Sequence, residues 1–292
     1  MKILILGGDG MIGHKMAQVL SVQNHEIVIS IREKKELTLK SISSKVKVFL
    51  NDFINDNILD LLDKVNPDVI INAIGITTRR GVTENISDSI YLNSFFSHQL
   101  SNWALAFKKR LIHFSTDCVF SGSEGSYLED TTPDALDYYG KTKGLGEINS
   151  KSSLTIRSSI IGPELFNKTE LFEWIINNKE KEINGFSRVM YSGVTTIYMA
   201  RLVADLIDNH KNLSGIYNVA SKPISKFELL HLINDNFDLK LVINKDQSII
   251  SNKTLDPSKI DNELGIKSSN WNELIIELKK DYMHFGDLYK TK

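Results

Sequence analysis

A short apolar run that leads directly into a glycine-rich turn constrains the fold more than any other stretch of the chain. Residues 2–6 are mostly isoleucine and leucine, a composition typical of a strand buried on both faces of a parallel sheet. The turn at 7–13 contains four glycines. Beyond it, apolar residues recur every three or four positions, which predicts an amphipathic helix; they are Ile12, Met16, Val19 and Leu20. The glycines therefore occupy a strand-to-helix junction.

Such a junction suits a dinucleotide. The first turn of a helix presents unpaired N–H groups to an anion, and glycines remove the Cβ atoms that would hold a pyrophosphate away from the backbone. The glycines fit two spacings, one starting at Gly7 and one at Gly8, so the pattern does not choose between subclasses of dinucleotide-binding fold. The residues expected to contact the cofactor here are Gly7, Gly10, Met11, Ile12 and Gly13.

The second predicted strand, 26–31, bears on the choice between NADH and NADPH. A site that prefers NAD usually has a carboxylate at the end of this strand, where it binds the ribose 2′-hydroxyl. Here Ser30 and Arg32 occupy that region, and a guanidinium can hold a 2′-phosphate by charge-assisted hydrogen bonds. The alternative is a solvated arginine at the start of a charged run, 32–36, which includes Glu33. We expect NADPH, and NADH stays open.

Strands and helices alternate along the first half of the chain. Apolar runs at 46–50, 68–72 and 111–114 predict three more strands, and helical patterns at 58–65 and 87–107 lie between them. Short connections with this alternation are typical of a doubly wound parallel sheet. We therefore expect an α/β fold, a Rossmann-type doubly wound parallel sheet, with a smaller, mixed α/β C-terminal lobe that binds the substrate.

We expect residues 1–160 to form the cofactor-binding domain, joined again by about 193–220, and residues 161–292 to form mainly the substrate lobe. The small residues that follow the fourth strand would let a cofactor ribose lie close to the backbone. Asn93, in the long helix, is the polar residue expected to lie beside the sheet. The cofactor contacts expected from this part are Ala73, Ile74, Gly75 and Asn93.

Composition narrows the range of partners. The chain of 292 residues has 35 basic and 36 acidic side chains, so it lacks the basic surface expected of a protein that binds nucleic acid or an anionic membrane. The single cysteine, Cys118, allows no internal disulfide and no multi-cysteine metal site, and it is typical of a reducing compartment. The sequence has neither a signal-peptide pattern nor about 18 consecutive apolar residues. We expect a cytoplasmic protein without a metal, and a homodimer is one candidate assembly.

The stretch 115–120, directly after the strand at 111–114, is the first candidate for chemistry. It holds a hydroxyl, a carboxylate and a thiol at Thr116, Asp117 and Cys118. Active-site loops of parallel sheets lie beyond the carboxyl ends of their strands. The sequence therefore predicts that this stretch borders the active site.

Tyr139 and Lys143 are the second candidate. They lie four positions apart in a predicted helix, so both side chains share one face. An ammonium group near the phenol is expected to lower its pKa and make Tyr139 a proton donor and acceptor near neutral pH. Tyr138 has a threonine four positions on and lacks this pairing. The alternative is a surface helix with a solvated lysine.

With these features together, the chain resembles the extended short-chain dehydrogenase/reductases and, within them, the dTDP-4-dehydrorhamnose reductase branch. The resemblance covers nearly the whole chain. It rests on Gly7-x-x-Gly10-x-x-Gly13, Asp52-Phe53, Asn72-Ala73, Asn93, Ser115-Thr116-Asp117-x-Val119-Phe120, Tyr139-Gly-Lys-Thr-Lys143 with Gly146-Glu147, Arg157-Ser158-Ser159 and Gly215-Ile-Tyr-Asn-Val219.

The resemblance implies that Thr116, Tyr139 and Lys143 form a catalytic trio and that Asp52 and Phe53 flank the adenine. It implies that NADPH gives a hydride to the C4 carbonyl of a UDP- or dTDP-linked 4-keto-6-deoxyhexose, or of its 2-acetamido derivative, while Tyr139 supplies the proton. Such a reaction belongs to deoxysugar biosynthesis for surface glycans. A non-catalytic alternative is a regulatory subunit, because the NADP-binding β subunit of methionine adenosyltransferase resembles the same branch.

Two positions depart from the rhamnose-forming members, which usually carry tyrosine where this chain has Cys118 and tryptophan where it has Ile160. In the related GDP-fucose synthases and plant-type UDP-rhamnose synthases, the position matching Cys118 is a cysteine that acts as an acid/base in epimerisation. Cys118 is therefore a candidate for C3 epimerisation before reduction, with Glu164 as the second acid. The alternative is a buried thiol that only fills space.

Three residues are weaker candidates for contacting the substrate, and each has a structural alternative. Asp117 could anchor the turn instead, Trp174 could belong to the core, and Arg188, like Lys168, could be a solvated charge rather than a ligand of the substrate diphosphate.

Overall fold

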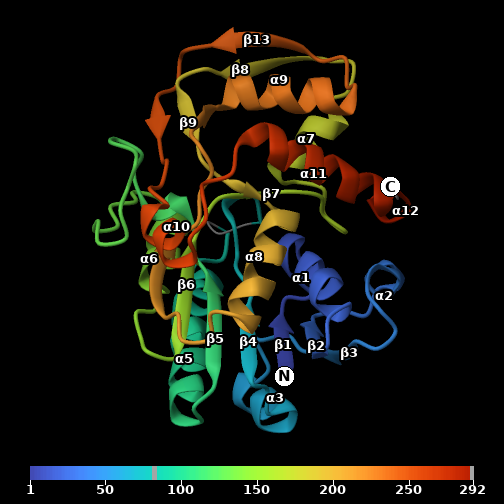
Figure 1. Cartoon of the computed structure of the whole chain (residues 1–292), viewed down its shortest axis with the longest axis vertical. Helices are drawn as coiled ribbons and strands as arrows, with labels where there is room; N and C mark the ends of the chain where they lie inside the picture. The colour runs from blue at the N-terminus through green and yellow to red at the C-terminus, as the bar shows by residue number, and fades with distance from the viewer. Residues whose placement is uncertain (81–83, 290–292) are drawn as a thin grey trace.

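Seven parallel strands form the central sheet of the computed structural model, which describes residues 1–80 and 84–289. The strands are β1 (Lys2–Leu6), β2 (Glu26–Ile31), β3 (Lys47–Leu50), β4 (Val69–Asn72), β5 (Arg110–Phe114), β6 (Ser153–Arg157) and β11 (Gly215–Asn218). Their order is β11-β6-β5-β4-β1-β2-β3, and each neighbouring pair is parallel. The predicted doubly wound parallel sheet is confirmed (Figure 1).

The side chains of β1 show how helices cover both faces of this sheet. Ile3 and Ile5 pack in one buried cluster, and Leu4 and Leu6 pack in another on the opposite face. This alternation follows from the two-residue period of a strand. The first cluster includes side chains of α1 (Met11–Ser21) and α8 (Thr196–Asp208), and the second includes those of α3 (Ile58–Val65) and α5 (Phe96–Ala106).

The predicted helix at 87–107 is not one continuous α-helix. The structure divides it into α4 (Ile86–Ile90), a π-helical turn at Tyr91–Phe95 and α5. A π turn contains one residue more than an α turn, and such turns are frequent at functional sites. Because apolar residues are present throughout this segment, their spacing does not show where the additional residue of the π turn is inserted.

The C-terminal lobe has a core of its own. Phe172, Leu229, Ile233, Trp271 and Leu278 are among its buried members. Its longer helices are α7 (Leu171–Asn177), α9 (Lys226–Phe237) and α11 (Trp271–His284). Short strands accompany them: β7 (Ile160–Ile161), β8 (Glu182–Phe186), β9 (Val189–Tyr191), β10 (Val194–Thr195), β12 (Ile224–Ser225), β13 (Val242–Asp246) and β14 (Ser251–Asn252). The domain boundaries stay a prediction, although β11 does pair with β6 of the main sheet.

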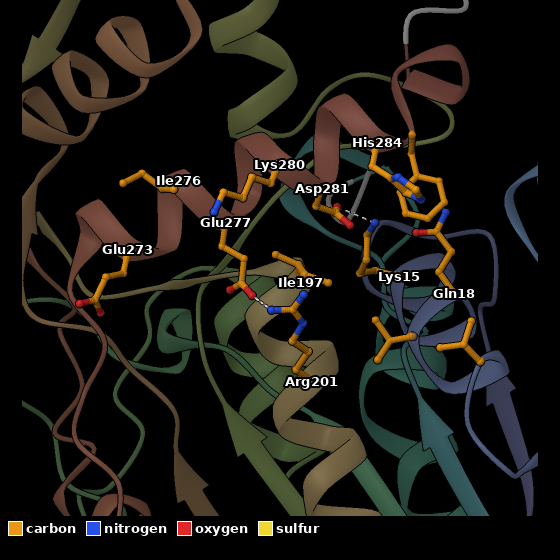
Figure 2. Close-up of a pocket in the computed structure, with 13 residues that line it drawn as sticks. Lys15, Gln18, Ile197, Arg201, Glu273, Ile276, Glu277, Lys280, Asp281 and His284 are labelled. Atoms are coloured by element: carbon orange, nitrogen blue, oxygen red, sulfur yellow. Dashed lines mark ion pairs between the residues drawn. The ribbon is translucent and has the colours of Figure 1, made fainter.

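The lobe meets the sheet where α11 crosses α1 and α8 (Figure 2). Lys15 of α1 and Asp281 of α11 form a buried ion pair of 2.6 Å, and Arg201 of α8 pairs with Glu277 of α11. A cavity of about 840 Å³ lies between these three helices. Two ion pairs on its walls link α11 to α1 and α8, so this cavity lies at the joint between the lobe and the helices that cover the sheet.

The remaining helices are short, and several of them place site residues. They are α2 (Glu36–Ser41), α6 (Tyr138–Leu145), α10 (Ser258–Leu264), α12 (Gly286–Tyr289) and the 3-10 turns at Thr78–Arg80 and Asp117–Val119. Among the described residues, no helix combines the length and the apolar character needed to cross a membrane.

Candidate active site and cofactor groove

The glycine turn between β1 and α1 has a shape that only glycines allow. Gly7 has a φ of +77°, in the left-handed region, and a Cβ added at Gly13 would collide with the carbonyl oxygen of Gly7. Gly10 is the N-cap residue of α1, and no side chain caps this helix start. The first amides of α1 are thus available to an external anion, so the residues present fit the diphosphate of a dinucleotide.

Two adjoining cavities continue from this turn along the carboxyl ends of the strands, and together we call them the cofactor groove. They share Gly10, Ala73, Ile74 and Gly75. The outer cavity, of about 240 Å³, is also lined by Gly7, Ser30, Arg32, Asp52 and Phe53. The inner cavity, of about 110 Å³, is also lined by Met11, Ile12, Ser115, Tyr139, Lys143 and Glu170. Nearly all residues predicted to contact the cofactor therefore lie along one groove, and Gly13 and Asn93 lie behind its wall.

Arg32 lines the outer cavity with an exposed side chain, and its contact with a ribose 2′-phosphate stays a prediction. Glu33, the nearby acid that would repel such a phosphate, pairs with Lys35 at 3.6 Å instead. Asp52 accepts a hydrogen bond of 2.8 Å from the side chain of Asn55, and Phe53 packs against Phe96 with ring centroids 5.2 Å apart. These contacts fix the wall of the outer cavity.

Asn93 supports the groove from behind. Its side chain is buried; Oδ1 accepts from the Ile76 amide at 2.8 Å, and Nδ2 donates to the Ile76 carbonyl and to Thr142 Oγ1 at 3.0 Å each. The π turn therefore carries a side chain that ties the loop after β4 to α6. Asn93 shapes the groove near Gly75, where an added Cβ would lie 3.3 Å from its Oδ1.

Thr116 and Asp117 form a tight turn at the end of β5. The hydroxyl of Thr116 accepts from the Cys118 amide and donates to Asp117 Oδ1, both at 3.1 Å. The same carboxylate oxygen accepts from Ser159 Oγ at 3.0 Å. Asp117, a candidate for contacting substrate, thus holds the turn, and it keeps the Thr116 hydroxyl beside the phenol of Tyr139.

Tyr139 and Lys143 both line the inner cavity, but their electrostatics differ from the expectation. Burial raises the pKa of Tyr139, and Cys118 adds to this, while a hydrogen bond with Thr116 acts in the opposite direction. Lys143 donates from Nζ to the Phe114 carbonyl at 2.6 Å, and burial lowers its own pKa to about 8. The predicted lowering of the phenol pKa by Lys143 was wrong, because desolvation outweighs an ammonium group directed at another acceptor.

Cys118 lies close enough to Tyr139 to affect its pKa, and its thiol is mostly buried. Burial, followed by the charge of Asp117, raises the pKa of the Cys118 thiol to about 12. A thiol in this environment is neutral at physiological pH. It therefore lacks the thiolate that would remove a proton from carbon.

Glu164 does not lie in the inner cavity, which corrects the expectation that it could act there as a second acid. Its buried carboxylate accepts hydrogen bonds from the amides of Thr169 and Glu170 at 2.7 and 2.8 Å. It thereby fixes the segment that leads into α7. Lys168 donates to the Glu164 carbonyl at 2.6 Å, so this residue too is structural rather than a solvated charge.

Trp174 and Arg188 differ in their placement. Trp174 is 39% exposed and lines a third cavity, of about 180 Å³, between α7, β8 and α9. Arg188 lies exposed in the turn between β8 and β9 and does not line that cavity. The cations that do line it are Arg79 and Lys226.

Two residues of the site were missed from the sequence. Glu170 is the N-cap residue of α7, yet its side chain does not cap the helix; it accepts from Thr77 Oγ1 at 3.4 Å and lines the inner cavity. Lys226 begins α9, and burial lowers its pKa while the charge of Asp117 raises it. The sequence carries no signal for either residue, because a loop and a separate lobe bring them to the site.

Comparisons with known proteins show what the whole chain is similar to. The family model described as the RmlD substrate binding domain matches residues 1–283. The dTDP-4-dehydrorhamnose reductase of Aggregatibacter actinomycetemcomitans is 23% identical over 305 residues, which cover 95% of this chain and 98% of that protein. Several other curated relatives align over about half of their own length.

A further curated relative and a crystal structure are also similar to this chain. The methionine adenosyltransferase 2 subunit beta of Pongo abelii is 25% identical over 308 residues, covering 94% of this chain and 88% of that protein. A crystal structure of dTDP-4-dehydrorhamnose reductase from Bacillus anthracis in complex with NADP has a TM-score of 0.73 at 17% identity, covering 96% of this chain and 99% of that one. At this identity the structural match shows the fold.

Proposed function

Because this chain belongs to the family of the RmlD substrate binding domain, we propose that it catalyses the reduction of the C4 carbonyl of a nucleotide-linked 4-keto sugar with NADPH. The substrate class is a UDP- or dTDP-linked 4-keto-6-deoxyhexose or its 2-acetamido-2,6-dideoxy derivative. The observation that carries the proposal is that Tyr139 and Lys143 line the inner cavity of the cofactor groove, with the Thr116 hydroxyl hydrogen-bonded to Tyr139.

The proposed chemistry needs one proton and one hydride. When bound, NADPH supplies the hydride to C4. Tyr139, whose phenol is protonated at neutral pH, donates its proton to O4. The hydroxyl of Thr116 donates its one proton to Asp117 Oδ1 in the structure, and we propose that it turns to donate this proton to O4 as negative charge forms there. The loss of such a donor typically costs about 10²–10³ in rate.

Lys143 is proposed to hold the nicotinamide ribose. Its Nζ is anchored by the Phe114 carbonyl at the end of β5 and lines the cavity that Gly75 borders. Because burial lowers its pKa to about 8, this ammonium group can lose and regain a proton near neutral pH.

For the nucleotide sugar, we propose Arg79, Lys226 and Glu170 in place of Arg188 and Glu164. Arg79 donates to the Thr169 carbonyl at 2.6 Å and lines the third cavity with Lys226, so the two cations can meet a diphosphate there. Trp174 offers a flat apolar surface to the base. Glu170, beside Tyr139, can accept a hydrogen bond from a sugar hydroxyl.

The test of the proposed function is NADPH consumption with UDP- and dTDP-linked 4-keto-6-deoxyhexoses. We expect turnover with at least one of them. Tight NADPH binding without turnover on any of these substrates would contradict the proposed reductase activity. It would favour the alternative, a regulatory NADP-binding subunit like the methionine adenosyltransferase subunit to which the chain is similar.

Replacing Arg32 by alanine is expected to weaken NADPH binding by roughly 3- to 10-fold and to leave NADH binding unchanged, because only NADPH carries the 2′-phosphate and Arg32 is exposed to solvent. Dissociation constants measured by cofactor fluorescence check this. Lys34→Ala, at a neighbouring exposed cation that does not line the outer cavity, is the matched control. Equal losses of affinity for NADPH and NADH would show that Arg32 does not recognise the 2′-phosphate.

Epimerisation at C3 is the second candidate activity, since Cys118 lies beside Tyr139. A thiol with a pKa of about 12 argues for reduction without epimerisation. Product formed in heavy water is therefore expected to carry only background deuterium at C3, as measured by mass spectrometry. Deuterium at C3 that disappears in Cys118→Ser would contradict reduction without epimerisation and would show that the thiol acts as an acid/base.

A further inference from the structure

His14 is a buried histidine at the start of α1 that the proposed chemistry does not use. Its Nδ1 lies 2.8 Å from the Gly10 carbonyl oxygen, and its Nε2 lies 3.0 Å from the hydroxyl of Tyr289. Its side chain has no exposure to solvent, and burial lowers its pKa to about 3. The imidazole is therefore neutral at physiological pH.

These two contacts determine the tautomer of His14. A carbonyl oxygen can only accept, so Nδ1 carries the proton and donates it to Gly10. A neutral imidazole then has no proton on Nε2, which accepts from the Tyr289 hydroxyl. The two hydrogen bonds therefore support the same tautomer. The bond from Tyr289 holds the ring in the tautomer and orientation in which Nδ1 donates to the Gly10 carbonyl.

The Gly10 carbonyl affects the groove indirectly, through the N–H group of the next residue, Met11. It shares a planar trans peptide unit with the N–H of Met11, and in such a unit the two groups point in opposite directions. The carbonyl accepts both the His14 backbone amide at 3.0 Å and the His14 ring. By holding the carbonyl toward the helix, His14 keeps the Met11 N–H directed outward, where a cofactor phosphate would bind.

Tyr289 belongs to α12, far from Gly10 in the sequence, and its side chain contacts His14 of α1. Its ring stacks on Tyr282 of α11 at 5.4 Å and meets the His14 ring edge-on. Its carbonyl accepts from Lys168 Nζ at 3.0 Å, and that nitrogen also donates to the Glu164 carbonyl. The end of the described chain thus connects the glycine turn with the segment that positions Glu170.

We propose that His14 is a positioning residue for the phosphate-binding amides of the glycine turn and that Tyr289 locks it in place, so that α12 forms part of the cofactor-binding machinery. This inference rests on the proposed NADPH cofactor. It makes cofactor affinity dependent on a C-terminal helix that does not line the groove.

The test is Tyr289→Phe, which removes one hydroxyl and keeps the ring contacts. We expect the NADPH dissociation constant, measured by fluorescence, to rise about 3- to 10-fold, the range for one lost hydrogen bond. Tyr282→Phe is the matched control in the same aromatic cluster, and we expect its dissociation constant to stay within about twofold of the wild type.

A second readout separates this role from a merely structural one. Coupling between two sites is reciprocal, so NADPH must slow amide hydrogen exchange in residues 286–289 of the wild type and lose that effect in Tyr289→Phe. If the wild type binds NADPH but Tyr289→Phe binds it equally well, the inference is overturned and the proposed function stands. If the wild type does not bind NADPH, the proposed function itself fails.

Discussion

Replacing Tyr139 by phenylalanine is expected to lower kcat by about 10²–10⁴-fold and to leave the NADPH dissociation constant unchanged. The phenol is the proposed proton donor to O4, and general acid catalysis contributes about this much. The ring stays in place because α6 is held by contacts that do not involve the hydroxyl, such as the Asp137 cap on the Gly140 amide at 2.8 Å. Steady-state kinetics with NADPH and the best 4-keto substrate measure the effect.

Tyr138→Phe is the matched control, because Tyr138 precedes Tyr139 in the same helix and its side chain is half exposed. It is expected to retain wild-type kcat. A Tyr139→Phe enzyme with kcat within tenfold of the wild type would place the proton donor elsewhere, and Thr116 would be the next residue to test.

The second large effect concerns stability. Arg157 and Glu147 form a buried, bidentate ion pair in which Nε and Nη2 each donate to the carboxylate at 2.7 Å. The two side chains are 2% and 5% exposed. Replacing Arg157 by alanine leaves the Glu147 carboxylate buried and without this partner, which is expected to lower the free energy of unfolding by about 3–5 kcal/mol.

The pair also holds the site, since Ser115 Oγ donates to Glu147 Oε1 at 2.7 Å directly before Thr116. Urea unfolding followed by circular dichroism measures the loss. Lys40→Ala is the control, because Lys40 and Glu36 form an ion pair of 2.8 Å that is exposed on both sides, and it is expected to leave the unfolding midpoint unchanged. A loss for Arg157→Ala as small as the control's would mean that water reaches the buried pair.

The sheet and the glycine turn could be predicted because local patterns determine them. Ile3 and Ile5 pack on one face and Leu4 and Leu6 on the other, as continuous apolar strands between two helical layers require. Gly13 is needed where α1 passes close to the Gly7 carbonyl, a contact between residues only six positions apart. Most residues predicted to contact the cofactor therefore lie along one groove.

The site electrostatics and the substrate side could not be predicted in the same way, because they depend on burial and on contacts between distant segments. The spacing of Tyr139 and Lys143 places them on one face but does not show that Lys143 donates to Phe114 instead. Glu164 and Glu170 are similar in sequence context, yet one is bound by backbone amides and the other lines the inner cavity.

The strands of the C-terminal lobe were missed for another reason. β13 is mostly exposed and contains lysine and aspartate, so it carries neither the alternation nor the apolar run that marks a strand. It forms because β8 offers a parallel partner, a contact across about 60 residues that sequence periodicity does not reveal.

The proposed passage of a hydride from NADPH to C4 of a nucleotide-linked sugar can be followed with an isotope. The experiment uses NADPH deuterated at the transferred position, a 4-keto-6-deoxyhexose linked to UDP or dTDP, and mass spectrometry and NMR of the product. We expect one deuterium per product molecule, located at C4, and loss of that product in Tyr139→Phe. Absence of a deuterated product with every such substrate, while NADPH still binds, would contradict it.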